Sequence, residues 1–247
     1  MSFSMRQNRK SKIAHRFGAK APIYDAHAAA QEHIAQSLAA RLPDLKAPRI
    51  LEIGCGTGLM SKHLLERYPD GTFTITDISA PMLAKARENI SPGAQQKIDW
   101  RQMDGEAPDL LQQYDLIVAN MVFHWFIHKN AALKSLLGML CPGGMLHYTI
   151  PGPCNFPEWR EALRTQEPAL EKCETLPGET EEEIFTIDYG STLEFLRTLK
   201  RTGADLPEEG YHPLSPDEMQ QAIKICDEKH AGKISWQILY RALHHAA

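Results

Sequence analysis

The chain has 247 residues, 43% of them hydrophobic, so it can bury the core of one α/β domain with an insertion, and two equal domains are not expected. Its formal net charge of -4 argues against binding nucleic acid through a broad basic surface. No apolar run reaches the roughly 20 residues of a membrane-spanning helix, and no apolar secretory leader is visible. We therefore expect a cytoplasmic protein without a membrane partner.

The cysteines are odd in number and scattered, which predicts free thiols in a reducing compartment: Cys55, Cys141, Cys154, Cys173 and Cys226. The pair His124 and His128 has helical spacing but lacks an acidic or thiol partner at the spacing of metal ligands. We therefore expect no bound metal.

The N-terminal 20 residues carry no acid and a concentration of basic side chains: Arg6, Arg9, Lys10, Lys12, Arg16 and Lys20. Two interpretations stay open, a solvated tail or a docking surface for an acidic partner. Asp25 is then placed to cap a helix that runs to about Leu42, with Ile34 and Leu38 on its apolar side.

The next stretch, residues 49–60, predicts a strand, a tight turn and a helix. Ile50 to Ile53 form a short apolar run, and Gly54, Gly56 and Gly58 follow at every second position. Glycine permits a positive φ and leaves no Cβ in the way of a ligand. A dinucleotide fingerprint, G-x-G-x-x-G, would place the third glycine one residue later, so a different nucleotide-like ligand is favoured.

With the acidic Glu52 on its strand, this pattern resembles motif I of the class I S-adenosylmethionine-dependent methyltransferases. The resemblance implies a Rossmann-like fold with a mostly parallel seven-stranded sheet and helices on both faces. It also implies a helical lid insertion after the fifth strand, and S-adenosyl-L-methionine bound at Glu52 and the three glycines.

The following elements alternate between strand and helix. We expect strands around Phe73 to Ile75, Ile98 to Gln102, Tyr114 to Asn120 and Met145 to Ile150, and helices over 81–90 and 130–140, the first with Ser79 as its cap. Such alternation is typical of a doubly wound parallel sheet, whose ligand lies across the carboxyl ends of the strands.

Polar residues follow three of these strands, and the resemblance assigns them to the cofactor. Asp77 would accept hydrogen bonds from the ribose hydroxyls and Asp104 one from the adenine amino group. The neighbouring Ile78 and Gly105, and Asn120 after the fourth strand, complete the expected cofactor contacts.

The domain organisation follows from these elements. We assign residues 1–48 to a basic N-terminal segment with capping helices and 49–150 to the cofactor-binding core. Residues 151–230 form a lid insertion that selects the substrate, and 231–247 supply a last strand, around Ile234 to Leu243. Within the insertion, a helix from Ser191 to Thr202 is expected to end at Gly203.

Two blocks outside the core resemble the malonyl-acyl-carrier-protein O-methyltransferases of biotin synthesis. They are the run Lys12, Ile13, Ala14, Phe17, Gly18, Ala21, Tyr24, His27, Ala28, Gln31 and the run Leu196, Arg197, Leu199, Lys200, Gly203, Ala204. That family commonly has a Gln-Trp pair after the fourth strand. Here the pair is His124-Trp125.

The resemblance implies methyl transfer from S-adenosylmethionine to the free carboxylate of malonyl-acyl-carrier protein, by an enzyme that we expect to be a monomer. This carboxylate is already ionised near neutral pH, so no general base is needed. Either Arg197 or Lys200 is expected to hold the carboxylate, unless both lie on a solvated helix face. Tyr24 either covers the cofactor or holds the carboxylate, and Trp125 is either a core residue or a substrate contact.

Three alternatives stay open at this stage. The first is a small-molecule carboxyl or other O-methyltransferase with the same cofactor fold. The second is a non-catalytic module that binds the cofactor or a partner protein. A dehydrogenase comes third, because the glycine spacing disfavours it.

Overall fold

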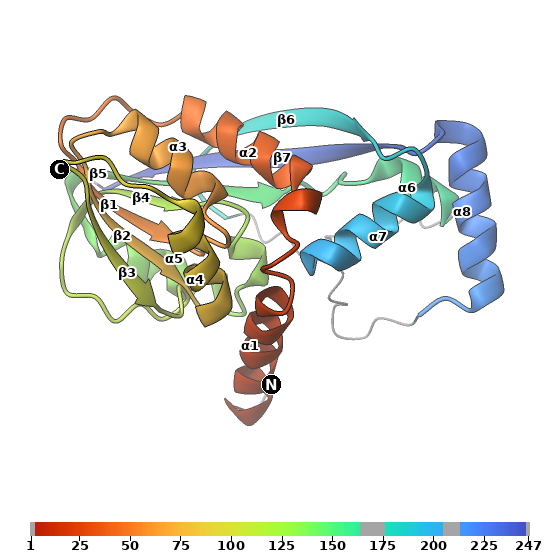
Figure 1. The fold of residues 1–247 in the computed structure, drawn as a ribbon, viewed down its shortest axis with the longest axis horizontal. Helices are drawn as coiled ribbons and strands as arrows, with labels where there is room; N and C mark the ends of the chain where they lie inside the picture. The colour runs from red at the N-terminus through yellow and green to blue at the C-terminus, as the bar shows by residue number, and fades with distance from the viewer. Residues whose placement is uncertain (1–2, 164–175, 205–212, 246–247) are drawn as a thin grey trace.

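The sheet determines where the site lies. The computed structural model describes residues 3–163, 176–204 and 213–245. These residues form a seven-stranded sheet in the order β3-β2-β1-β4-β5-β7-β6 (Figure 1). Strands β1 to β5 are parallel to one another, β7 runs antiparallel to β5, and β6 runs antiparallel to β7. The strands are β1 Arg49–Ile53, β2 Thr72–Asp77, β3 Lys97–Gln102, β4 Tyr114–Ala119, β5 Leu140–Pro151, β6 Glu179–Asp188 and β7 Lys233–His244.

The helices connect these strands, and α1 projects from the body of the molecule with its N-terminal end farthest out (Figure 1). Helices α6 and α8 lie at the end of the long axis opposite the C-terminus (Figure 1). The helices are α1 Phe3–Gly18, η1 Asp25–His27, α2 Ala29–Ala40, α3 Leu59–Arg67, α4 Ala80–Asn89, η2 Phe123–Trp125, α5 Lys129–Leu137, α6 Pro157–Ala162, α7 Thr192–Thr202 and α8 Pro216–His230. The expected Rossmann-like fold is therefore confirmed.

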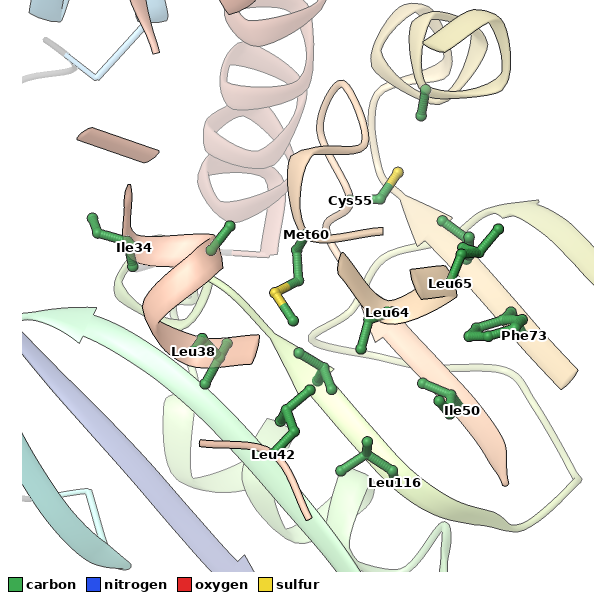
Figure 2. Packing of buried hydrophobic residues seen from close by; sticks show 14 of the residues in the cluster. Ile34, Leu38, Leu42, Ile50, Cys55, Met60, Leu64, Leu65, Phe73 and Leu116 are labelled. Atoms are coloured by element: carbon green, nitrogen blue, oxygen red, sulfur yellow. The ribbon is translucent and has the colours of Figure 1, made fainter. Parts of the chain in front are cut away.

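Both faces of the central strands are buried, because successive strand residues point to opposite sides of the sheet. Ile50 packs with Leu38 of α2 and Leu64 of α3 on one face (Figure 2). Its neighbour Leu51 belongs to a second cluster on the other face, which includes Leu133 of α5. This double burial explains why most residues of β1 and β4 are apolar.

The structure corrects three sequence-based expectations about elements. Asp25 does not cap the following helix: it begins the short helix η1, and α2 starts at Ala29 and ends at Ala40. The helix expected to reach Leu140 ends at Leu137, because Leu140 is already paired with Tyr114 as the start of β5. Ser79 occupies the N-cap position of α4, but its hydroxyl makes no capping hydrogen bond.

Strand β6 was not predicted, and it lies inside the range assigned to the lid insertion. Its sequence is mostly charged at the start, and only Phe185 and Ile187 pack against the core cluster, while Ile184 is exposed. An edge strand has only one neighbour, so it tolerates such polar sequences. The strand therefore lacks the apolar run that marks the central strands.

Two further observations concern the described part of the chain. Four of its cysteines are free thiols, Cys55, Cys141, Cys154 and Cys226, whereas Cys173 lies outside the described residues. None of the helices within the described ranges combines the length and the apolar character needed to cross a membrane.

Candidate active site

A cavity of about 370 Å³ lies at the carboxyl ends of the parallel strands. Five segments line it: the glycine turn after β1, the ends of β2, β3 and β4, and the N-terminal helix α1. Residues of α7 and of the segment after β5 close one side. The cavity thus lies where a doubly wound sheet binds its ligand.

The three glycines of the turn divide into two roles. Gly54 and Gly56 line the cavity with φ values of 67° and 56°. A Cβ on Gly56 would meet nothing within 4 Å, so the missing side chain leaves space for a ligand. Gly58 does not line the cavity: it is the N-cap of α3 with φ 93°, and a Cβ there would lie 2.7 Å from Cδ1 of Ile90.

Glu52 lies behind the turn and does not line the cavity. Its side chain is buried and accepts a hydrogen bond of 2.6 Å from Ser61 Oγ at the start of α3. Burial raises the pKa of Glu52 to about 8, and the charge of Asp77 adds to the shift. A neutral Glu52 thus connects β1 to α3 and supports the glycine turn from below.

Asp77 ends β2 and faces the cavity. One carboxylate oxygen accepts from the backbone N–H of Gly56 at 2.9 Å, and the other from the backbone N–H of Ser79 at 2.7 Å. Burial raises the pKa of Asp77 to about 6, although these two hydrogen bonds act in the opposite direction. The carboxylate is therefore fixed in position and ionised at neutral pH.

Asp104 lies in the turn after β3, and a residue of α1 contacts it. Lys10 Nζ lies 2.6 Å from Asp104 Oδ2 and 3.0 Å from Glu106 Oε2. The second Asp104 oxygen accepts from the Glu106 backbone N–H at 3.0 Å. Gly105, between the two acids, also lines the cavity and leaves no room for a Cβ beside Ile53.

Aromatic side chains form part of the cavity wall. Trp125 in η2 and Tyr24 before η1 both line the cavity. The ring of Phe17 meets that of Trp125 edge to face, with centroids 5.3 Å apart. Burial raises the pKa of Tyr24, as do the charges of Asp25 and Asp77, so the phenol stays protonated. Because Trp125 lines the cavity, its side chain is accessible to a ligand there.

Two more predicted cofactor residues, Ile78 and Asn120, also line the cavity. Asn120 Oδ1 accepts from Thr149 Oγ1 at 2.7 Å, which orients the amide. The departure from the family pattern, His124, lines the cavity as well. Burial lowers its pKa to about 3, with a smaller effect of the Lys129 charge, so the imidazole is neutral.

The two predicted carboxylate ligands lie elsewhere. Arg197 and Lys200 are exposed on α7 and do not line the cavity, although Leu199 between them does. Arg197 Nη1 lies 3.5 Å from Glu194 Oε2, one turn earlier on the same helix. In this structure both cations lie on the solvated face of α7, as the second interpretation of the sequence had it.

Sequence reasoning missed three residues that organise the site. Lys10 was counted only as one cation of a basic segment, and Glu106 was given no role, although Lys10 contacts both Asp104 and Glu106. Asp25 accepts from Thr57 Oγ1 in the glycine turn instead of capping a helix. Asp104-Gly105-Glu106 offered a signal, because two acids at the end of a strand need a partner. Nothing in the sequence indicated that α1 provides it.

S-adenosyl-L-methionine fits this cavity by its donor and acceptor chemistry. Gly56 leaves open space above the turn, and the Asp77 carboxylate, at the end of the next strand, suits two ribose hydroxyls. Asp104 is an acceptor at the end of the third strand. The fold and this site define a class I S-adenosylmethionine-dependent methyltransferase.

Comparisons with known proteins narrow the class to a family. Residues 51–146 match the profile of a methyltransferase domain. The chain is 33% identical over 252 residues to a malonyl-[acyl-carrier protein] O-methyltransferase of Magnetococcus marinus, covering 94% of this chain and 92% of the relative. It is 37% identical over 242 residues to the biotin biosynthesis bifunctional protein BioCD of Bordetella avium, covering 92% of this chain and 51% of that protein. The chain belongs to the malonyl-[acyl-carrier protein] O-methyltransferase family.

The solved structures agree on the fold. A candidate methyltransferase of Bacillus halodurans C-125 superposes with a TM-score of 0.59 at 13% identity, over 86% of this chain and 99% of that chain. At this identity the likeness concerns the fold alone.

Proposed function

We propose that this protein transfers a methyl group from S-adenosylmethionine to the free carboxylate of a malonyl thioester on an acyl carrier protein, early in biotin synthesis. The relative from Magnetococcus marinus carries that substrate in its name. The structural observation that carries the proposal is one continuous cavity, which Asp77, the glycine turn, Trp125 and Tyr24 all line. Cofactor and acceptor can therefore meet in the same cavity.

Within this proposal, each cavity residue has a defined task. Asp77 binds the ribose hydroxyls, and Asp104 accepts from the adenine amino group. Asn120, Ile78 and Gly105 pack around the cofactor between them, as expected from their places at the strand ends. The bound cofactor supplies an electrophilic methyl group on a sulfonium.

The chemistry requires positioning more than proton transfer. A malonyl carboxyl has a pKa of roughly 4, so it is ionised when it arrives. No side chain has to remove a proton, and His124, with its pKa lowered to about 3, is a poor base. The aromatic rings of Phe17, Trp125 and Tyr24 exclude water and keep the carboxylate oxygen aligned with the methyl group.

Exposed cations beside the cavity fit an acidic carrier protein. Helices α1 and α7 meet there, since a Cβ on Gly203 would lie 3.4 Å from Phe17 Cδ1. Each helix presents an exposed lysine, Lys12 on α1 and Lys200 on α7, and Arg197 lies beside the second. Such charges speed the encounter with an acidic partner and act less at high salt. A monomeric state and a cytoplasmic location, consistent with the free thiols, belong to the same proposal.

The test is transfer of a labelled methyl group to three acceptors: malonyl carrier protein, malonyl-coenzyme A and free malonate. We expect the carrier protein to be preferred and Asp77→Asn to abolish transfer. Asp99→Asn is a matched control, because Asp99 is an exposed acid on β3 that pairs with Arg101 instead of facing the cavity. Equal use of free malonate would favour a small-molecule carboxyl methyltransferase, and cofactor binding without turnover on any acid would favour a non-catalytic module.

A further inference from the structure

Lys10 joins the N-terminal helix to two separate parts of the active site. Its ammonium lies 2.6 Å from Asp104 Oδ2 and 3.0 Å from Glu106 Oε2, although these acids follow it by more than ninety residues in the chain. The side chain is 26% exposed, so the contact is partly shielded from solvent. Burial alone would lower the pKa of Lys10, but the hydrogen bonds to Asp104 and Glu106 outweigh it and raise the pKa.

Glu106 extends this contact to the aromatic wall. Its side chain is 4% exposed and accepts hydrogen bonds from the backbone N–H groups of Ile127 at 3.2 Å and His128 at 2.6 Å. These two residues follow the end of η2, which carries Trp125, after one intervening residue. Lys10 therefore connects α1 with the segment behind Trp125 as well as with the end of β3.

The rest of α1 rests on the site through apolar contacts. Ile13 is buried, Phe17 meets the Trp125 ring, and both line the cavity together with Ala14. The helix otherwise projects away from the body of the molecule (Figure 1). Apolar contacts are not directional, so they do not by themselves determine how far along its axis α1 lies over the cavity. A charge-assisted hydrogen bond at one residue of the helix does determine this position.

We propose that Lys10 is a positioning residue that holds α1 closed over the adenine side of the cofactor, through Asp104 and Glu106. The proposal rests on the proposed function only in placing the adenine near Asp104. Each Asp104 oxygen has a second lone pair, so the carboxylate can bind Lys10 and an adenine amino group together. Lys10 also neutralises part of the charge of the two neighbouring acids and holds the Asp104 carboxylate in place.

The experiment compares Lys10→Met, Lys10→Arg and Lys12→Met by calorimetric titration of S-adenosylmethionine in the absence of any acceptor. Lys12 is exposed on the same helix, so Lys12→Met controls for the loss of one positive charge. We expect Lys10→Met to weaken cofactor binding roughly 10-fold or more, Lys10→Arg to recover part of the loss, and Lys12→Met to leave the cofactor affinity unchanged.

Hydrogen exchange of the α1 amides supplies a second readout that a general loss of stability would not reproduce. In Lys10→Met, exchange should rise in residues 10–18 while β1 and β4 stay protected. Unchanged or tighter cofactor binding by Lys10→Met, or equal effects of Lys10→Met and Lys12→Met, would overturn the proposal. Because no acceptor is present, this outcome is independent of whether malonyl carrier protein proves to be the substrate.

Discussion

Asp25 accepts a hydrogen bond from the hydroxyl of Thr57, which lies in the glycine turn. Asn89 at the end of α4 donates both to the other Asp25 oxygen and to the Thr57 carbonyl, each at 2.9 Å. The acid that follows Tyr24 is thereby joined to the glycine turn that lines the cavity. This small network holds Tyr24 at the cavity.

We expect Asp25→Ala and Thr57→Val each to weaken cofactor binding roughly 10-fold, because each removes the same hydrogen bond between the N-terminal segment and the turn. Thr57→Ser keeps the hydroxyl and should bind as the parent does. Calorimetric titration of the three variants measures this. A normal affinity in Asp25→Ala would show that the segment is held by its other contacts.

The pKa of Glu52 predicts how stability depends on pH. The folded pKa of about 8 lies above the ordinary value of 4.5. Between these values the unfolded chain has released the proton that the folded chain retains, so stability falls as pH rises, by about 1.4 kcal/mol per unit, and levels off above pH 8. Glu52→Gln removes this contribution, and its stability relative to the parent should increase from pH 5 to pH 8. Parallel curves from denaturant unfolding of the two proteins would contradict the assignment.

Asp77 should govern the pH dependence of cofactor binding in the opposite direction. Its pKa of about 6 in the folded protein means that the carboxylate gains its charge as pH rises through 6. Ribose hydroxyls donate more strongly to the ionised form, so affinity should rise between pH 5 and 7. Titrations at a series of pH values measure this in the parent and in Asp77→Asn. The variant should bind weakly and show no such rise.

The two roles of the glycines can be separated by experiment. Gly58→Ala should lower stability by about 1–3 kcal/mol, because φ is 93° and the new Cβ would strike Ile90. Gly56→Ala should lower stability less, because its Cβ enters open space, but it should abolish cofactor binding. Thermal unfolding and titration of both variants make the comparison. Equal losses of stability would mean that the cavity space at Gly56 has no special role.

The sequence predicted the strands and the ligand edge of the sheet well, because β1 and β4 are buried on both faces and most of their residues are apolar. Asp77, Asp104 and Asn120 were placed correctly at the cavity, since each ends or follows a strand. The sequence could not show which residues from distant parts of the chain contact this edge of the sheet. Lys10 and Asp25 act through contacts with Asp104 and Thr57, and no local pattern records such a pairing.

The structure places Arg197 outside the cavity, through geometry that sequence spacing did not determine. A helix presents a buried and an exposed face, and the pattern of α7 fits more than one rotation about its axis. In the structure Phe195 is fully buried, Leu199 reaches the cavity, and Arg197 and Lys200 face solvent. The burial of the apolar residues determines the rotation of α7, and this rotation places the two cations on the exposed face.

These exposed cations lead to a prediction about the carrier protein. Arg197→Ala with Lys200→Ala should raise the KM for malonyl carrier protein several-fold at low ionic strength, and the effect should shrink in about 0.5 M salt, where charges are screened over a few ångströms. The KM for malonyl-coenzyme A and the kcat for both acceptors should stay near parent values. Lys224→Ala is the control, because Lys224 is an exposed lysine of α8 that does not line the cavity. A loss of kcat with both acceptors would instead restore Arg197 or Lys200 as the ligand of the malonyl carboxylate, reached by a movement of α7.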